Sequence, residues 1–88
     1  MSFEVTFAST AVRDLDRIPP RIVPAVIEFA FGDLARKPHR VGKRLERELA
    51  GLYSARRGPY RILFEIYDEK VRVIVIRVDH CADAYRPR

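Results

Sequence analysis

The chain has 88 residues, of which 48% are hydrophobic and 33% charged, and it carries a formal net charge of +5. These values are typical of one small globular domain, so we expect a single domain over residues 1–88. The one cysteine, Cys81, excludes an internal disulfide and a cysteine-rich zinc site. With no signal sequence and no apolar run long enough to cross a bilayer, we expect a cytoplasmic protein.

A strand and two helices are the first elements predicted in chain order. Apolar and polar residues alternate over residues 3–7, which predicts a short, half-buried strand. Ser9 or Thr10 is then predicted to cap a helix that ends before the proline pair at residues 19–20. A second helix follows the prolines to about Arg36, because its apolar residues recur at helical spacing. The two helices form an αα-hairpin with apolar faces to bury.

A basic connector and three strands complete the predicted fold. Residues 39–47 form the connector, and residues 52–57, 60–67 and 71–79 have the composition of strands joined by short turns. The even-numbered positions of 60–67 are apolar and can receive the helices, which leaves the odd-numbered positions on an open face. We therefore predict an α+β fold, in which an N-terminal strand and an αα-hairpin precede a three-stranded antiparallel meander with the helices packed on one face.

Three arginines are expected on the open face of this sheet. A two-residue turn followed by a three-residue turn would set Arg56 directly opposite Arg61, and Arg61 directly opposite Arg77. Like charges directly opposite each other destabilise a sheet, so a sequence chosen for stability alone would avoid such a row. We interpret the row as a binding surface for a polyanion.

The positive charge is concentrated in the middle of the chain. Residues 36–61 contain nine Lys or Arg and two Glu, a local charge of +7, whereas residues 1–35 carry −2 and residues 62–88 are neutral. This distribution points to nucleic acid, an acidic protein segment or a membrane surface as a partner, and an ordinary solvated surface is the alternative.

The motifs of several enzyme classes are absent from the sequence. It contains no P-loop, dinucleotide fingerprint, zinc-ligand spacing or nucleophile elbow, and two histidines without a dense carboxylate cluster argue against a two-metal nuclease. We therefore expect no metal and no cofactor, but a site where guanidinium groups stabilise a phosphorane while another side chain moves protons. RNA suits such a site, since its 2′-OH is an internal nucleophile. The candidates are Arg56, Arg61, His80 and Tyr85.

The second half of the chain carries a combination of short motifs. They are found at residues 49–57, at residues 60–64, at Asp68 and in the tail at residues 78–86. In these motifs, and in the order and length of its elements, the chain resembles the RelE family of the RelE/ParE toxin superfamily. The resemblance implies a RelE-like sandwich and the toxin of a type II toxin–antitoxin system. It also implies a ribosome-dependent mRNA endonuclease, in which metal-free attack by the 2′-OH in the decoding site leaves a 2′,3′-cyclic phosphate and a 5′-OH, so that translation is inhibited.

Resemblance to RelE toxins also gives roles to individual residues. Arg61 would contact the scissile phosphate, Arg56 would assist from the preceding strand, and Tyr85 would orient or stack on the substrate base. Cys81 stands where many relatives carry an arginine proposed to protonate the leaving 5′-oxygen. Either His80 supplies that proton or the activity is attenuated.

Further basic residues are expected to contact RNA. They are Lys43 and Arg44 in the connector, Arg77 in the last strand and Arg86 in the tail. A solvated loop is the alternative for the connector pair, and an ion pair with an acidic neighbour is the alternative for Arg77. Arg57 is expected to face the helices or the rim and to have a structural role.

The resemblance implies partners as well as an activity. A cognate RelB-like antitoxin is expected beside the ribosome and mRNA, with operator DNA contacted only through the antitoxin, and no membrane partner is expected. The alternative within the superfamily is a non-catalytic ParE-like toxin that inhibits DNA gyrase. His80 and Tyr85 favour the RelE branch, and Cys81 argues weakly against it.

Overall fold

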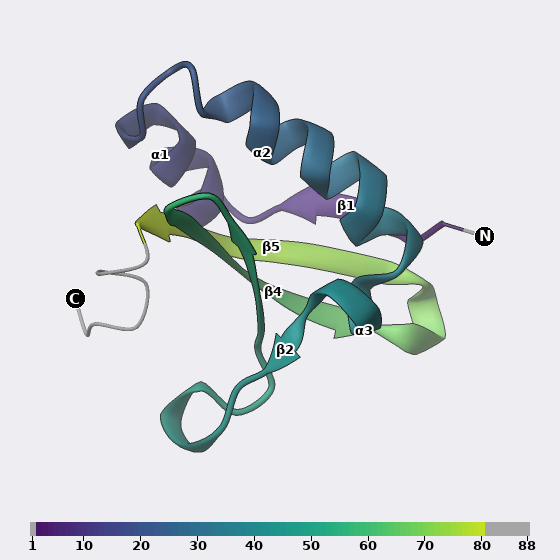
Figure 1. Ribbon diagram of the computed structural model, residues 1–88. Coiled ribbons are helices and arrows are strands. Elements are labelled where there is room, and N and C mark those ends of the chain that lie inside the picture. The colour runs from purple at the N-terminus through teal and green to yellow at the C-terminus, as the bar shows by residue number, and fades with distance from the viewer. Residues whose placement is uncertain (1, 81–88) are drawn as a thin grey trace.

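A five-stranded mixed sheet with helices against one face forms the protein, as seen in a computed structural model that describes residues 2–80 (Figure 1). The strand order is β1-β5-β4-β3-β2. β1 (Glu4–Phe7) runs parallel to β5 (Arg72–His80), and β3 (Tyr53–Arg57), β4 (Tyr60–Tyr67) and β5 form an antiparallel meander. The predicted α+β class and the meander are confirmed. β2 (Lys43–Arg44), which pairs with β3, was not predicted.

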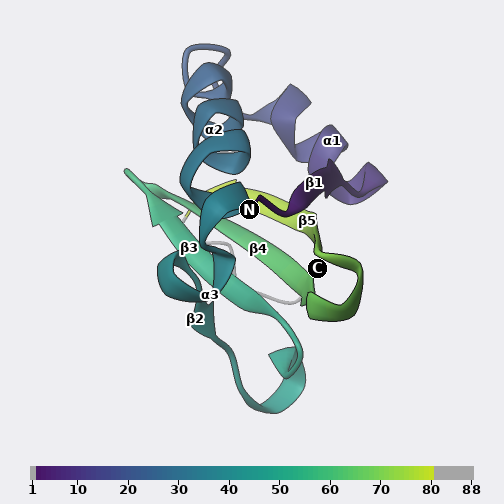
Figure 2. The ribbon, with the colours of Figure 1, turned by 90° about the vertical axis from the view of Figure 1, so that its right-hand side faces the viewer.

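The helices cover one side of this sheet, as Figures 1 and 2 show. α1 (Ser9–Arg17) and α2 (Val23–Phe29) form the predicted hairpin, and α2 continues as a π-helical segment, η1 (Ala30–Leu34). A third short helix, α3 (Pro38–Val41), occupies part of the predicted connector. No helix among residues 2–80 is long and apolar enough to cross a membrane.

Two short 3₁₀ turns complete the secondary structure. η2 (Arg47–Leu49) lies between β2 and β3, and η3 (Asp68–Lys70) joins β4 to β5. A close approach fixes the chain just before β2. A Cβ atom on Gly42 would lie 2.5 Å from the Phe64 ring and 2.9 Å from the Pro38 carbonyl oxygen. Glycine therefore allows the connector to pack directly on the core.

The hydrophobic core lies between the helices and the sheet. Its largest fully buried side chains come from α2, η1, α3, β4 and β5, and they include Val26, Leu34, Ile62, Phe64 and Val75. The predicted apolar face of β4 is confirmed, because its even-numbered residues all belong to the core or pack against it. Burying each such side chain contributes about 1.5–3 kcal/mol, so this face fixes which side of the sheet receives the helices.

The start of α1 differs from the prediction. The residue that precedes the helix is Ala8, which makes no side-chain cap, so the expectation that Ser9 or Thr10 caps it was wrong. The Thr10 hydroxyl instead donates a hydrogen bond of 2.6 Å to the carbonyl oxygen of Ile76 in β5. This bond satisfies a strand carbonyl rather than a helix N–H, which the local sequence could not reveal.

The register between β4 and β5 also differs from the prediction. Arg61 lies opposite Asp79, and Arg77 lies opposite Leu63, so the expectation that Arg61 faces Arg77 was wrong. The turn is one residue longer than assumed, because Val71 closes η3 in the left-handed conformation with φ 50°. A bulge at Ile76 inserts one more residue into β5, so the pairing beyond it is shifted by two residues from the prediction.

The longer turn and the bulge each shift the register by one residue, and together they leave the side chains of β5 beyond the bulge on the predicted faces of the sheet. A shift of one residue alone would turn every following side chain to the other face of the sheet. The second shift at the bulge restores the alternation, so that Val75 and Val78 are both buried in the core. Arg77 consequently stays on the open face with Arg61, as a diagonal neighbour rather than a direct partner.

Candidate functional site

Arg56 and Arg61 lie directly opposite each other on β3 and β4, next to the turn that joins these strands. Their predicted opposition is confirmed. Gly58 in the turn has φ 59°, which glycine adopts without strain, and this two-residue turn fixes the register. Nε of Arg56 donates a hydrogen bond of 3.1 Å to the Gly58 carbonyl oxygen, so the turn also orients one edge of this guanidinium.

Arg61 has neighbours of both signs. Its like-charged neighbour is Arg56 on one side, and Asp79 lies opposite it on the other. The residue is half-buried, with its Nε atom removed from solvent. Asp79 therefore offsets part of the repulsion between the two arginines and holds negative charge close to Arg61.

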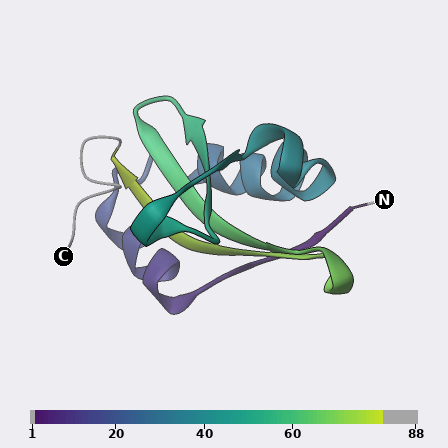
Figure 3. The same ribbon diagram turned by 90° about the horizontal axis from the view of Figure 1, so that it is seen from below.

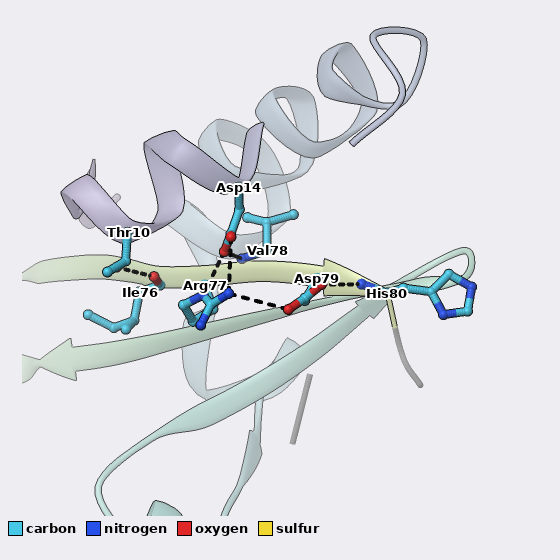
Figure 4. Close-up of polar contacts among 7 residues, drawn as sticks. All are labelled: Thr10, Asp14, Ile76, Arg77, Val78, Asp79 and His80. Carbon is cyan, nitrogen blue, oxygen red and sulfur yellow. Dashed lines mark hydrogen bonds and ion pairs between the residues drawn. The ribbon is translucent and has the colours of Figure 1, made fainter. Parts of the chain in front are cut away.

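Arg77 is held by carboxylates (Figure 4). Its Nε and Nη2 atoms donate hydrogen bonds of 2.7 and 3.1 Å to the two carboxylate oxygens of Asp14, and Nη2 lies 3.4 Å from Oδ2 of Asp79. The hydrogen bond to Asp14 raises the pKa of Arg77, although burial acts in the opposite direction. Arg77 is thus a charged group fixed in two ion pairs.

Asp14 reaches Arg77 because α1 covers the edge of β5 beyond the end of β1. The Ala8 N–H donates to the Val75 carbonyl oxygen at 2.8 Å, and the Val78 N–H donates to the Asp14 carboxylate at 2.9 Å. Together with the Thr10 hydroxyl, these groups satisfy strand atoms that have lost their neighbouring strand. Asp14 is only 5% exposed, so its carboxylate is a buried connection between α1, Arg77 and the β5 backbone.

Asp14 was not among the predicted site residues, although the sequence contains a signal for it. Asp14 lies three residues after Ala11 and four before Ile18, on the apolar stripe by which α1 packs. A carboxylate on such a stripe requires a hydrogen-bonded or charged partner. Which partner it has depends on the β5 register, which the sequence pattern did not provide.

The other predicted site residues fall on both faces of the sheet. Lys43 pairs with Ser54, two residues before Arg56, so strand alternation puts it on the open face. Arg44 pairs with Tyr53, whose side chain packs against the core, so Arg44 belongs to the helix-covered face. The structure therefore brings Lys43, but not Arg44, to the face of the arginine pair.

His80 lies on the helix-covered face at the end of β5. It pairs with Tyr60, and the two rings make an edge contact with centroids 5.6 Å apart. In Figure 4 its imidazole points away from Arg77 and Asp79. The structure thus does not bring the His80 side chain to the face of Arg56 and Arg61.

The remaining predicted side chains have structural positions or lie outside the described residues. The guanidinium carbon of Arg57 lies 5.0 Å from the centre of the Phe29 ring, on the helix side, as expected for Arg57. Cys81, Tyr85 and Arg86 lie outside residues 2–80.

The open face can hold a phosphodiester. Guanidinium groups donate paired hydrogen bonds to phosphate oxygens, and two of them side by side can stabilise charge that develops on phosphorus. Lys43 adds a third positive charge to the same face. Among residues 2–80, no group of three His, Cys, Asp or Glu side chains is arranged to hold a metal ion.

Comparison with known sequences shows similarity to bacterial toxins. Residues 5–85 match the family model described as the ParE toxin of the type II toxin–antitoxin system parDE. Toxin RelG of Mycobacterium tuberculosis is 62% identical over 86 residues, which cover 98% of this chain and 99% of the relative. Toxin RelE of the same organism is 45% identical over 84 residues, which cover 96% of this chain and 87% of the relative.

Solved structures have the same architecture. The toxin–antitoxin complex RelBE2 from M. tuberculosis contains a chain that is 60% identical and superposes with a TM-score of 0.88, covering 91% of this chain and 99% of the other. A mutant of the E. coli toxin RelE in the free state is 21% identical and has a TM-score of 0.74, covering 97% and 88%. At that identity the similarity concerns the fold alone.

Proposed function

Because this chain belongs to the RelE/ParE superfamily of type II toxin–antitoxin toxins, we propose that it is an mRNA endonuclease that inhibits translation by cleaving mRNA in the ribosomal decoding site. The observation that carries this proposal is the direct opposition of Arg56 and Arg61 on the open face of the sheet. Such an arrangement costs stability and is suited to a phosphodiester.

In the proposed reaction, Arg61 binds the scissile phosphate and Arg56 assists from β3. The 2′-OH of the preceding ribose attacks the phosphorus and loses its proton, while the bond to the 5′-oxygen breaks and that oxygen takes up a proton. The products are a 2′,3′-cyclic phosphate and a 5′-OH. Both guanidinium groups stabilise the additional negative charge of the pentacoordinate intermediate, which a single cation would do less well.

The proton donor and the base-binding group are proposed from the end of the chain. Tyr85 is proposed to stack on or orient the substrate base. His80 lies on the helix-covered face beside Tyr60, so we expect it to contribute less to protonation of the 5′-oxygen than Arg61 contributes to phosphate binding. Cys81 stands where the resemblance to RelE toxins implies an arginine for this step, so the wild-type chain is proposed to be slow or attenuated.

A cognate antitoxin is the proposed protein partner. Solved relatives include the RelBE2 complex and the intact E. coli RelBE toxin–antitoxin complex. A face with Lys43, Arg56 and Arg61 would attract an acidic antitoxin segment, because complementary charge speeds association and selects partners. An antitoxin bound there would exclude RNA from the same face, and any contact with operator DNA would be made through the antitoxin.

A reconstituted translation complex with a defined codon in the decoding site tests the activity. The proposal expects the Cys81→Arg variant to cleave the mRNA at that codon. The purified wild-type chain should cleave at the same codon more slowly or not at all. A 2′,3′-cyclic phosphate on the upstream fragment identifies the chemistry. If the wild-type chain and Cys81→Arg both leave the mRNA intact, the proposal is wrong.

The same chain tests the ParE-like alternative in cells. Induction of an mRNA endonuclease should halt protein synthesis before any DNA damage response begins. A gyrase inhibitor should induce the DNA damage response first, with translation still running. The order of the two responses after induction separates the two functions.

A further inference from the structure

A polar pocket lies at the corner between α1 and β5, apart from the Arg56 and Arg61 pair. Its volume is about 170 Å³. It is lined by Thr10, Arg13, Asp14, Arg17 and Arg77. Three of these five side chains are arginines and one is a carboxylate, so positive charge predominates.

Arg13 and Arg17 form the outer wall of this pocket. They are four residues apart on α1, so their side chains lie on the same side of the helix, where like charges destabilise it. Both are exposed, and neither makes an ion pair or hydrogen bond to another residue in the described part of the chain. Two such arginines at one pocket fit an anion that is not part of this chain.

The carboxylate in the pocket does not neutralise these two arginines. Both oxygens of Asp14 accept hydrogen bonds from Arg77, and one of them also accepts the Val78 N–H. The inner wall is therefore a closed, hydrogen-bonded ion pair that fixes the position of Arg77. The outer wall keeps its positive charge for a ligand.

The pocket continues the open face of the sheet. Arg77 is the diagonal neighbour of Arg61 on that face, which places their Cα atoms roughly 7–8 Å apart. Seen from the side away from the helices, α1 lies beside β5 at the edge of the sheet (Figure 3). Guanidinium groups thus follow one another from β3 over β4 and β5 to α1, and the one on β5, Arg77, is already paired with Asp14 and Asp79.

We propose that the α1–β5 corner is a second phosphate-binding site, in which Arg13 and Arg17 hold the RNA backbone beside the scissile nucleotide. This inference rests on the proposed function and extends it, because it gives the RNA a path across the strands. A chain of regularly spaced phosphates fits a row of guanidinium groups that begins at Arg56 and Arg61. An acidic protein segment is the competing ligand that the experiment must exclude.

Binding of a short, fluorescein-labelled, 2′-O-methylated single-stranded RNA, which cannot be cleaved by 2′-OH attack, tests this site. The Arg13→Gln/Arg17→Gln variant should bind the RNA at least about tenfold more weakly than the wild-type chain. Its plot of log Kd against log salt concentration should also be shallower by about 1.4, since each lost phosphate contact on a single strand removes about 0.7. Fluorescence anisotropy over a salt series measures both quantities.

Lys37→Gln/Lys70→Gln is the matched control. It removes the same charge from two exposed positions that do not line the pocket. These positions lie beside α3 and in η3, two segments that the hydrogen bond between His39 and Asp68 joins. Its RNA affinity should fall by less than about threefold, through the loss of net charge alone. Unchanged melting temperatures show that both variants are folded.

Three other results would contradict the corner site. The inference is wrong if the wild-type chain does not bind this RNA at low salt, or if the control loses as much affinity as Arg13→Gln/Arg17→Gln. It is also wrong if the arginine variant loses affinity only for an acidic peptide. The Arg61→Gln variant separates this result from the proposed function. If Arg61→Gln loses RNA affinity and Arg13→Gln/Arg17→Gln does not, the corner site is wrong. If Arg61→Gln keeps full RNA affinity, the proposed cleavage site is wrong.

Discussion

Two groups of arginines share one face of the sheet but have different surroundings. One is Arg77, and the other is the pair formed by Arg56 and Arg61. Arg77 is 25% exposed and bound by the two oxygens of Asp14, while Arg56 is exposed and faces another arginine. A cation held in a buried, bidentate ion pair contributes to the structure, since removing either partner leaves a charge without compensation. Two cations placed opposite each other cost stability, so function is their better explanation.

The largest effect is expected at Arg61, and it should be on activity. Arg61→Ala should slow mRNA cleavage about 100-fold to 1000-fold, because it removes a group that stabilises charge in the transition state. Its stability should be unchanged or slightly higher, since the repulsion with Arg56 is removed. Cleavage rates in the reconstituted complex and thermal unfolding of the same samples measure both effects.

Arg57→Ala is the control for that prediction. Arg57 is the neighbour of Arg56 in sequence and has the same charge, but its guanidinium lies over Phe29 on the other face. Its loss should leave cleavage within about threefold of wild type and cost about 0.5–1 kcal/mol of stability. Equal losses of activity in Arg57→Ala and Arg61→Ala would show that net charge matters and the face does not.

The next largest effect is expected at Asp14, on stability. Asp14→Ala should lower the free energy of unfolding by about 2–4 kcal/mol, because it leaves Arg77 and the Val78 N–H without their buried acceptor. Urea denaturation at neutral pH measures this. Asp16→Ala, at an exposed position of the same helix, should change the stability by less than about 0.5 kcal/mol. Similar values for the two variants would remove the structural interpretation of Arg77.

The two regions also differ in how far the sequence predicts them. The opposition of Arg56 and Arg61 depends on a two-residue turn with glycine, which is a local property that the sequence contains. The position of Arg77 depends on Val71 in the left-handed conformation and on the bulge at Ile76, where β1 ends and α1 takes over the strand edge. Contacts between distant segments decide these features, so composition and alternation could not predict them.

A similar reason explains the elements that the sequence analysis missed. β2 has only two residues, both exposed and positively charged, and a pattern of alternation cannot be recognised over so short a segment. His80 was assigned to the site because it is close in sequence to the last strand. The pairing with Tyr60 instead places it on the other face, which only the register could tell.

A smaller effect on activity is therefore expected at His80. His80→Gln should reduce cleavage by less than about tenfold, well below the loss in Arg61→Ala, because its ring lies beside Tyr60 rather than beside the arginine pair. Rates measured at several pH values sharpen the test. If His80→Gln removes cleavage as completely as Arg61→Ala, the substrate must reach the end of β5, and His80 is the proton donor.

The smallest effect is expected at the exposed ion pair between Asp33 and Arg36, which is the surface counterpart of Asp14 and Arg77. Its atoms are 3.1 Å apart, and its side chains are 45% and 65% exposed. The hydrogen bond from Arg36 lowers the pKa of Asp33 below 3.8. A lowered pKa in the folded state means that the pair stabilises the protein above pH 3.8 and loses this contribution as the pH falls through the lowered value.

Asp33→Asn should consequently unfold at nearly the same temperature as the wild-type chain at neutral pH, with any small difference disappearing in acid or high salt. A loss in Asp33→Asn as large as that in Asp14→Ala would mean that ion pairing itself stabilises this fold, whether or not the pair is buried, and the distinction between Arg77 and the exposed arginines would no longer hold.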